Sequence, residues 1–232
     1  MVVIELNEER TMKLKPASAF TAVVACVASL AFANTSASAE VLDAPAPQTV
    51  VNEYDANFEI TADLESYLNT LSQGERTAFV NTMLPSTTVE TTTVTPANAA
   101  AKTSLEAAAA TGDIVTPFAT GCWTARTDWE QKNIYGGGIY SWYHVGRWCA
   151  NGSTVTSASR ADYGGQTYAI GWRKEGLTAS AAGVVSNQGR SYTQQKFVLG
   201  VGGWDVDTRY ECARVAGKSN ATATGTMTCG IY

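Results

Sequence analysis

Two acidic segments carry carboxylates at a spacing that general acid–base catalysis could use. Asp128 and Glu130 are two residues apart. Asp205 and Asp207 have the same spacing, and Glu211 follows four residues later. Because residues i and i+2 of a β-strand face the same side, each pair could converge on a glycosidic bond or hold a calcium ion. Calcium needs more oxygen ligands than either segment supplies, so solvated turn residues are the favoured interpretation.

His144 is the only histidine in the chain, so a Ser-His-Asp unit would have to use it. Its neighbours Tyr143 and Val145 are typical of a packed strand, and the chain contains no Gly-x-Ser-x-Gly sequence. A Cys-x-x-Cys sequence is absent as well, which disfavours a zinc site. We therefore expect no metal and no cofactor, and the sequence favours a non-enzymatic role.

Exposed aromatic rings flanked by polar side chains could stack on sugar rings, and the chain has six tryptophans. The candidate ligand-binding residues are Trp142, Trp148, Tyr168, Trp204 and Asp205, with Asn151 and Gln166 as further hydrogen-bonding groups. An aromatic stripe along a strand is more often core than binding platform, although one domain rarely buries so many tryptophans completely. Nucleic acid is not an expected partner, because the basic residues form no cluster.

The segment that would position these side chains begins near Gly121. All six tryptophans and 18 of the 20 glycines lie from Gly121 onward, whereas all six prolines precede it. Short runs rich in Val, Thr, Tyr and Trp alternate there with glycine-containing breaks. The predicted strands are 122–129, 138–149, 153–160, 166–173, 178–186, 190–200, 205–215 and 222–231. This pattern predicts an all-β domain over residues 121–232, either a β-sandwich or a barrel.

Side chains of the predicted strand 138–149 alternate between two bulky faces. One face carries Tyr140, Trp142, His144 and Trp148, and the other carries Ile139, Tyr143, Val145 and Cys149. Bulky residues on both faces indicate a central strand that is covered on both sides.

Four cysteines follow Gly121, which is an even number and favours two disulfides in an exported protein. The pairing Cys122–Cys149 with Cys212–Cys229 joins strands that are close in sequence, and we favour it. The nested pairing of Cys149 with Cys212 stays open, because Tyr210 two residues before Cys212 resembles the tyrosine corner of immunoglobulin domains.

Residues 1–39 have the features of a secretory signal peptide. Lys13 and Lys15 precede a short apolar run, and Ala37-Ser38-Ala39 supplies small side chains for cleavage. Met12 is a better start than Met1, because the segment 1–11 is acidic and the beginning of a signal peptide is normally basic. The apolar run is short, so we expect a secreted, extracellular protein without a membrane span after cleavage.

Residues 40–120 differ in charge from the predicted β domain. They carry eleven acidic and two basic residues, a net charge of −9, against +4 for 121–232. Apolar spacing predicts two short helices within 60–84, capped at Thr61 or Asp63 and broken near Gly74. We interpret 40–84 as an acidic, partly disordered arm, either a propeptide or a stalk, and 85–120 as a Thr/Ala-rich linker.

The sequence Trp148-Cys149-Ala150-Asn151-Gly152 and the glycine- and aromatic-rich residues after it resemble a group of proteins. These are uncharacterised secreted proteins of Gram-positive bacteria that share a Trp-Cys-x-x-Gly signature and a β-rich region. The resemblance covers only residues 121–232. It implies secretion and a β-rich fold, and it implies no activity and no site residues.

Two functions fit the sequence. The first is a secreted, non-catalytic binding module for a polysaccharide or a cell-surface glycan, which the tryptophan content favours. The second is an extracellular protein-directed factor, such as an inhibitor or an antagonistic toxin, with the acidic arm as its pro-region. An enzyme is the third and least favoured reading.

Overall fold

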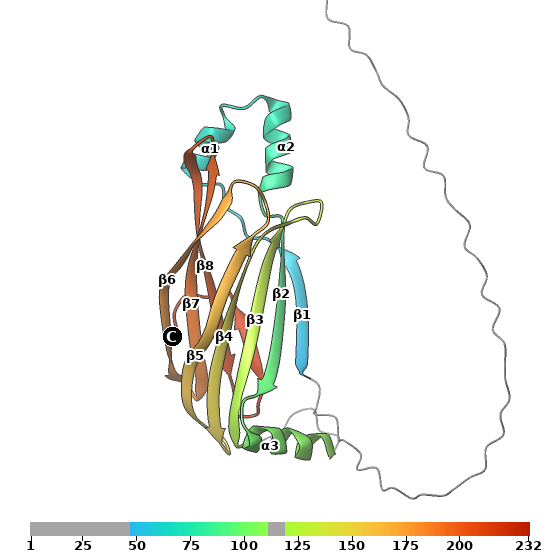
Figure 1. Ribbon diagram of the computed structural model, residues 1–232, viewed down its shortest axis with the longest axis vertical. Coiled ribbons are helices and arrows are strands. Elements are labelled where there is room, and N and C mark those ends of the chain that lie inside the picture. Colours follow the sequence, from blue (N-terminus) through green and yellow to red (C-terminus); the bar gives the residue numbers. More distant parts are fainter. Residues whose placement is uncertain (1–46, 111–118) are drawn as a thin grey trace, which may run out of the picture. The chain divides into compact units, whose positions relative to one another are not determined.

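The computed structural model describes residues 47–110 and 119–232, which form two antiparallel sheets (Figure 1). The strand order of sheet A is β1 (Gln48–Asp55), β2 (Thr87–Pro96), β3 (Gly121–Lys132), β4 (Gly138–Asn151) and β5 (Thr154–Thr167). The strand order of sheet B is β6 (Trp172–Val185), β7 (Gln188–Val201), β8 (Trp204–Gly217) and β9 (Ala223–Thr226). Neither sheet closes on itself, so the domain is a disulfide-bonded, mostly β sandwich rather than a barrel. The predicted signal peptide, 1–39, lies outside the described residues.

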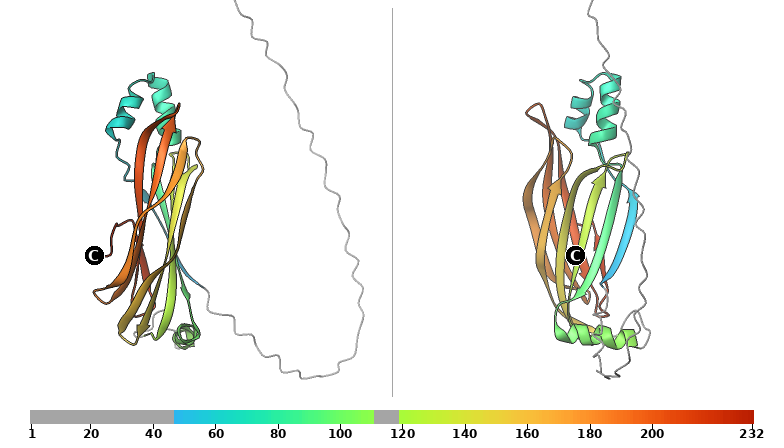
Figure 2. Two further views of the ribbon diagram at one scale, coloured as in Figure 1. Left: turned by 60° about the vertical axis from the view of Figure 1, so that its left-hand side comes forward. Right: turned by 45° about the vertical axis from the view of Figure 1, so that its right-hand side comes forward.

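Consecutive strands from β3 to β8 pair as hairpins, except at residues 168–171, where the chain crosses from sheet A to sheet B (Figure 2). The prediction of a separate strand over 166–173 is therefore wrong, because its ends belong to β5 and β6. The pair Gly164-Gly165, which predicts a break, lies inside β5. A Cβ atom at Gly165 would lie 2.6 Å from the carbonyl oxygen of Ser141, so the close approach of two strands requires glycine there.

Alternate residues of β3 and β4 fill the space between the two sheets. Four inward-facing residues of β4 are at most 1% exposed, as the alternation predicts: Tyr140, Trp142, His144 and Trp148. The ring centroids of Trp142 and Trp129 are 5.9 Å apart, and those of Trp148 and Trp123 are 6.1 Å apart. Each such pair contributes about 0.5–1.5 kcal/mol beyond the area that it buries. Tryptophan pairs therefore form much of the core.

Two short helices, α1 (Ala62–Leu68) and α2 (Gln73–Met83), confirm the prediction for residues 60–84. The side chain of Thr61 accepts a hydrogen bond from the first turn of α1, and Ser72 begins a capping box for α2. Helix caps of this kind can be predicted from sequence because the residues that form the capping hydrogen bonds lie within three positions of each other.

Helix α1 is part of the core and not of a detached arm. Its Leu64 and Leu68 are fully buried in the same apolar cluster as Trp129. At the end of α2, the carbonyl of Met83 accepts a hydrogen bond of 2.9 Å from Nε1 of Trp172. Helix α1 contacts β8 and the end of α2 contacts β6, both of sheet B. Removal of the helices would therefore expose apolar surface of the core.

The linker predicted at 85–120 is wrong over its first part, because β2 lies there, and α3 (Ala99–Ala110) follows. β2 is an internal strand of sheet A between β1 and β3. Its threonines replace the apolar residues that periodicity detects: Thr88 is fully buried, and Thr92 Oγ1 lies 3.0 Å from Thr127 Oγ1 of β3 in a buried pair. Threonine is β-branched and favours strands, so composition alone misleads here.

Both favoured disulfides are confirmed. Cys122 and Cys149 are register partners on β3 and β4, and Cys212 of β8 joins Cys229 in the segment after β9. The nested pairing is thereby excluded. Two disulfides indicate an oxidising environment. Among the residues that the structure describes, no helix is long and apolar enough to cross a membrane.

Candidate functional site

Two of the predicted ligand-binding residues, Trp142 and Trp148, are core residues. Each is 1% exposed. The Trp142 indole donates to the carbonyl of Cys212 at 3.2 Å, and the Trp148 indole donates to that of Lys218 at 2.9 Å. A ring that is enclosed between two sheets cannot stack on a ligand, so the prediction of a binding role for these two residues is wrong.

Trp204 and Asp205 begin β8 directly after the turn at Gly202 and Gly203. Both glycines have positive φ angles, 60° and 90°, which suit a two-residue hairpin turn. Trp204 is 77% exposed at this turn. A carboxylate oxygen of Asp205 lies 2.7 Å from Nη2 of Arg173 on β6, and this hydrogen bond lowers the pKa of Asp205. The turn thus presents one exposed aromatic ring, that of Trp204, beside the ion pair between Arg173 and Asp205.

The acidic residues of β8 do not converge on one site. The register between β7 and β8 shifts between Asp205 and Asp207, because a bulge inserts an extra residue and interrupts the alternation. Asp207 is buried and accepts a hydrogen bond from Arg209 Nε at 2.6 Å. Glu211 accepts a hydrogen bond of 2.6 Å from the Tyr140 hydroxyl, and burial raises the pKa of both groups. These carboxylates hold the fold together and do not form a catalytic pair.

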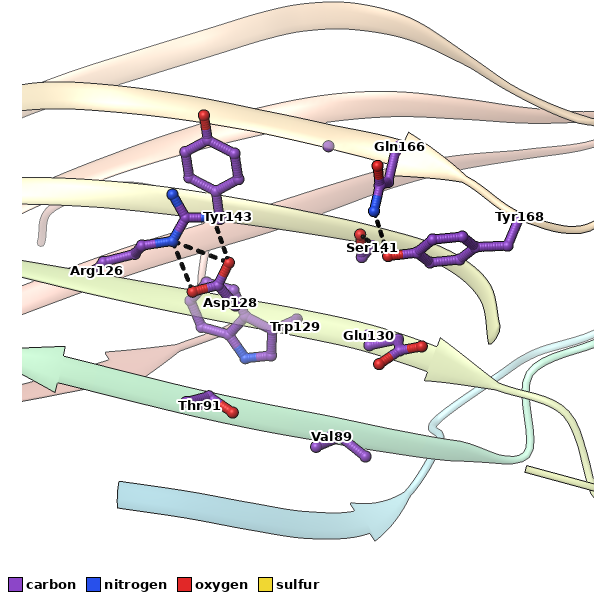
Figure 3. Close-up of a pocket in the computed structure, with 11 residues that line it drawn as sticks. Val89, Thr91, Arg126, Asp128, Trp129, Glu130, Ser141, Tyr143, Gln166 and Tyr168 are labelled. Atoms are coloured by element: carbon purple, nitrogen blue, oxygen red, sulfur yellow. Dashed lines mark hydrogen bonds and ion pairs between the residues drawn. The ribbon is translucent and has the colours of Figure 1, made fainter. Parts of the chain in front are cut away.

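A pocket of about 340 Å³ lies on the outer face of sheet A, across β2 to β5 (Figure 3). Its polar and aromatic lining includes Arg126, Asp128, Glu130, Tyr143, Gln166 and Tyr168. The fold brings the predicted sugar-binding residues Tyr168 and Gln166 into this pocket together with the candidate acid pair Asp128 and Glu130. Trp204 and Asp205 do not line it. The outer face of β4, which was expected to be covered, is open here: Tyr143 is only partly buried.

One end of the pocket is a fixed guanidinium group. Arg126 Nε and Nη2 donate to both carboxylate oxygens of Asp128 at 2.6–3.0 Å (Figure 3). The guanidinium carbon lies 3.7 Å from the centroid of the Tyr143 ring. This ring extends over Gly164, where a Cβ atom would lie 2.5 Å away, and its hydroxyl donates to Asp162 at 3.1 Å. The hydrogen bonds with Asp128 raise the pKa of Arg126, so the group stays charged.

The opposite end is formed by Tyr168, which is 49% exposed. Its hydroxyl lies 3.0 Å from Ser141 Oγ and accepts a hydrogen bond from Gln166 Nε2 (Figure 3). A Cβ atom at Gly138 would lie 3.0 Å from the Tyr168 ring and 2.8 Å from Glu130 Oε1. Glycine at that position therefore leaves room for both side chains beside the pocket.

The charges and hydrogen-bonding groups of this arrangement suit ligand binding. Both oxygens of Asp128 accept hydrogen bonds from Arg126, so this carboxylate is already paired within the protein. Glu130 has only a distant ion pair, with Lys132 Nζ 4.0 Å away, and can accept hydrogen bonds from a ligand. Within the described residues, no group of three or more His, Cys, Asp or Glu is arranged to hold a metal ion.

Arg126 and Tyr143 are pocket residues that sequence analysis did not select. A signal for Arg126 was present, because polar residues occupy every even position from 124 to 132, while Trp123 and Trp129 lie at odd positions. This alternation predicts one polar, outward face of a strand. It does not predict which residues of other strands lie beside that face.

His144 lies between the sheets and is fully buried, which makes it a packed histidine and not a catalytic one. Its Nε2 lies 2.8 Å from Ser191 Oγ, and its Nδ1 lies 3.3 Å from Thr193 Oγ1, so β7 satisfies both ring nitrogens. Burial, assisted by the charge of Arg160, lowers its pKa from 6.5 to about 4. The ring is therefore neutral at pH 7.

We expect acid to destabilise the domain through His144. In the unfolded chain His144 binds a proton below about pH 6.5, whereas in the folded chain it does so only below about pH 4. The contribution of neutral His144 to the free energy of unfolding is therefore fully present above pH 6.5 and is lost as the pH falls from 6.5 to about 4. The loss amounts to about 3 kcal/mol. Urea unfolding at several pH values measures it, and the His144→Gln variant should lack this contribution. Because the chain has a single histidine, NMR titration of its ring gives the pKa directly. A pKa near 6.5 would contradict the prediction.

Comparisons with known proteins assign the chain to no family. Searches of protein-family models, of curated proteins and of solved structures gave no significant match. The class of the protein is therefore defined by its own structure: a disulfide-bonded β-sandwich with a polar, tyrosine-flanked pocket on the outer face of one sheet.

Proposed function

We propose that the protein is a secreted, non-catalytic module that binds a polysaccharide or a cell-surface glycan in the pocket on sheet A. The observation that carries this proposal is the half-exposed ring of Tyr168 beside groups that donate and accept hydrogen bonds. A sugar ring has an apolar face that fits an aromatic ring and hydroxyls that need planar polar partners. Arg126 supplies donors and Glu130 supplies acceptors at the two sides of such a ligand.

The size and position of the pocket fit a sugar unit. Its volume of about 340 Å³ is near the lower end of small-molecule sites, which span about 300–1,000 Å³. The pocket lies on the face of a sheet, so a polymer can continue across neighbouring strands on either side of the bound unit. The lining carries one cation and two carboxylates, Arg126, Asp128 and Glu130, which favours neutral sugars over acidic ones.

Secretion is supported by the two disulfides and by the signal-like features of residues 1–39. The alternative, a protein-directed factor with a removable pro-region, has less support. A cleavage that removed 40–120 would take away β1 and the internal strand β2. An acidic segment that supplies an internal strand is a poor candidate for a removable mask.

Replacing Tyr168 tests the proposal. We expect Tyr168→Ala to weaken glycan binding by about tenfold or more, because central aromatic contacts usually contribute at least about 1–2 kcal/mol. Tyr168→Phe keeps the ring and loses only the hydroxyl that bonds to Ser141 and Gln166, so its loss should be smaller. A panel of insoluble polysaccharides and a glycan array identify the ligand, and calorimetry then measures the affinity.

Trp204→Ala is the matched control, because it removes a more exposed ring that does not line the pocket. Its affinity should equal that of the unmodified protein. The proposal fails if no polysaccharide retains the protein and no sugar changes its tryptophan fluorescence. It also fails if Trp204→Ala abolishes binding while Tyr168→Ala does not.

A further inference from the structure

Strand β1 forms an open edge of sheet A. It pairs with β2 on one side, and within residues 47–110 and 119–232 no strand pairs with its other side. Seven of its eight residues are exposed. Val50 and Val51 are 57% and 63% exposed, and they lie on opposite faces of the strand because Val50 pairs with buried Thr92 and Val51 with Thr91. Over residues 49–55 this edge therefore offers backbone groups that no other described strand pairs with, flanked by apolar side chains.

Most of the usual protection of edge strands is absent from β1. Edge strands are normally blocked by lysines and other charged side chains, by prolines or by bulges, and β1 carries charges only toward its Asp55 end. Between Gln48 and Asp55 there is no basic residue and no proline, and the register with β2 continues over eight pairs without a shift. The other edge of sheet A differs: β5 has two register shifts against β4, and Arg160 on it donates to Ser180 Oγ of β6 at 2.8 Å. β1 is thus a regular strand that is ready to pair.

The distribution of charge along β1 favours antiparallel over parallel pairing with a second copy of the same strand. Its acidic residues, Glu53 and Asp55, lie at one end, and the β-branched residues Thr49, Val50 and Val51 lie toward the other. A parallel copy would place each carboxylate beside its equivalent, which is unfavourable. An antiparallel copy, centred on the valines, separates the two acidic ends and brings β-branched side chains together.

We propose that a second copy of this chain pairs with β1, antiparallel and about a two-fold axis, so that two sheets A become one continuous sheet. Antiparallel self-pairing is closed and isologous, so it stops at a dimer and does not extend into a filament. The pocket is lined by residues of β2 to β5 and the segment after β5, and not by β1, so each protomer keeps its pocket open. The dimer does not depend on the glycan-binding proposal.

Analytical ultracentrifugation of the purified protein over a range of concentrations tests the proposal. We expect the average mass to rise reversibly from that of one chain toward that of two. Hydrogen exchange should slow with concentration at the amides of residues 49–53 and not in β5. A protein that stays monomeric at every concentration, or a dimer without protection of β1, would overturn the proposal.

Charge variants at Val51 make the test specific. Val51→Lys and Val51→Glu each place like charges next to one another across the two-fold axis, so each variant should dimerise at least about tenfold more weakly. Mixing the two variants should restore dimers, because the charges are then opposite. A variant that was merely misfolded would not recover on mixing.

Val184→Lys is the matched control, because Val184 is another exposed strand valine, on β6 of sheet B. Its dimerisation should equal that of the unmodified protein. At a concentration where the unmodified protein is monomeric, circular dichroism should give the same thermal midpoint for all three variants, since the replaced side chains are exposed. If Val51→Lys dimerises normally, or if the Lys and Glu variants do not associate on mixing, a different surface is responsible and the proposal is wrong.

Discussion

A chain that begins at Gly121 is expected to lack a cooperatively folded domain, although it retains every tryptophan and both disulfides. The deletion removes β2, which pairs with β3 from Thr87–Lys132 to Pro96–Trp123. It also removes Leu64 and Leu68, which are fully buried, and so opens the apolar cluster of the core. Domains are stable by only about 5–15 kcal/mol, and two fully buried leucines alone account for about 4–10 kcal/mol. Circular dichroism and chemical denaturation measure the outcome.

A chain that begins at Ala56 is the matched control for this deletion. Of the elements that the structure describes, it lacks only β1, an edge strand whose residues are mostly exposed, and it keeps β2 and both N-terminal helices. We expect it to unfold cooperatively, at a lower denaturant concentration than the full chain. If the chain that begins at Gly121 were equally stable, residues 40–120 would be a removable segment, as the propeptide hypothesis requires.

Trp142→Ala is expected to destabilise the domain by about 3–5 kcal/mol, the usual result of removing a large aromatic side chain from a core. The ring is 1% exposed, lies parallel to that of Trp129 at 14° and also lies against Phe197. Its indole nitrogen donates to the Cys212 carbonyl, which would lose this partner. Urea unfolding at pH 7 measures the change in free energy.

Trp204→Ala serves as the control, because the same residue type is replaced at a position that is 77% exposed. Its free energy of unfolding should change by less than about 0.5 kcal/mol. A Trp142→Ala variant that is stable but no longer binds a glycan would contradict this prediction. It would show that Trp142 stacks on the ligand and is not a core residue.

Local patterns predicted much of the sandwich correctly. The alternation along β4 placed Tyr140, Trp142, His144 and Trp148 on one buried face, where the structure has them. The two disulfides also followed from local reasoning, because Cys122 and Cys149 lie on strands joined by one hairpin. Predictions failed where glycine was taken to indicate a turn and a high threonine content was taken to indicate a linker. Gly165 permits close strand packing instead of a turn, and the threonines of β2 pair with β3 instead of forming a linker.

The candidate site was predictable only in part. Tyr168 and Gln166 were selected for their residue types, and both line the pocket. Trp142 and Trp148 were selected on the same grounds, yet they are buried. Residue type does not distinguish these cases, because a tryptophan on a strand is suited equally to a core and to a binding face. Exposure depends on which sheet packs over that face.

The sequence by itself determined the properties that depend on neighbours along the chain. These are the strand alternation and the short helices α1 and α2. Short separations favoured the observed pairing of the cysteines, but the structure was needed to exclude the nested pairing. The tertiary structure alone decided that β2 is internal, that β1 is an open edge, and that Arg126 and Tyr143 meet Tyr168 at one pocket. These features join residues from separate strands, and the order of strands in a sheet is set by the packing of the whole domain and not by any local segment.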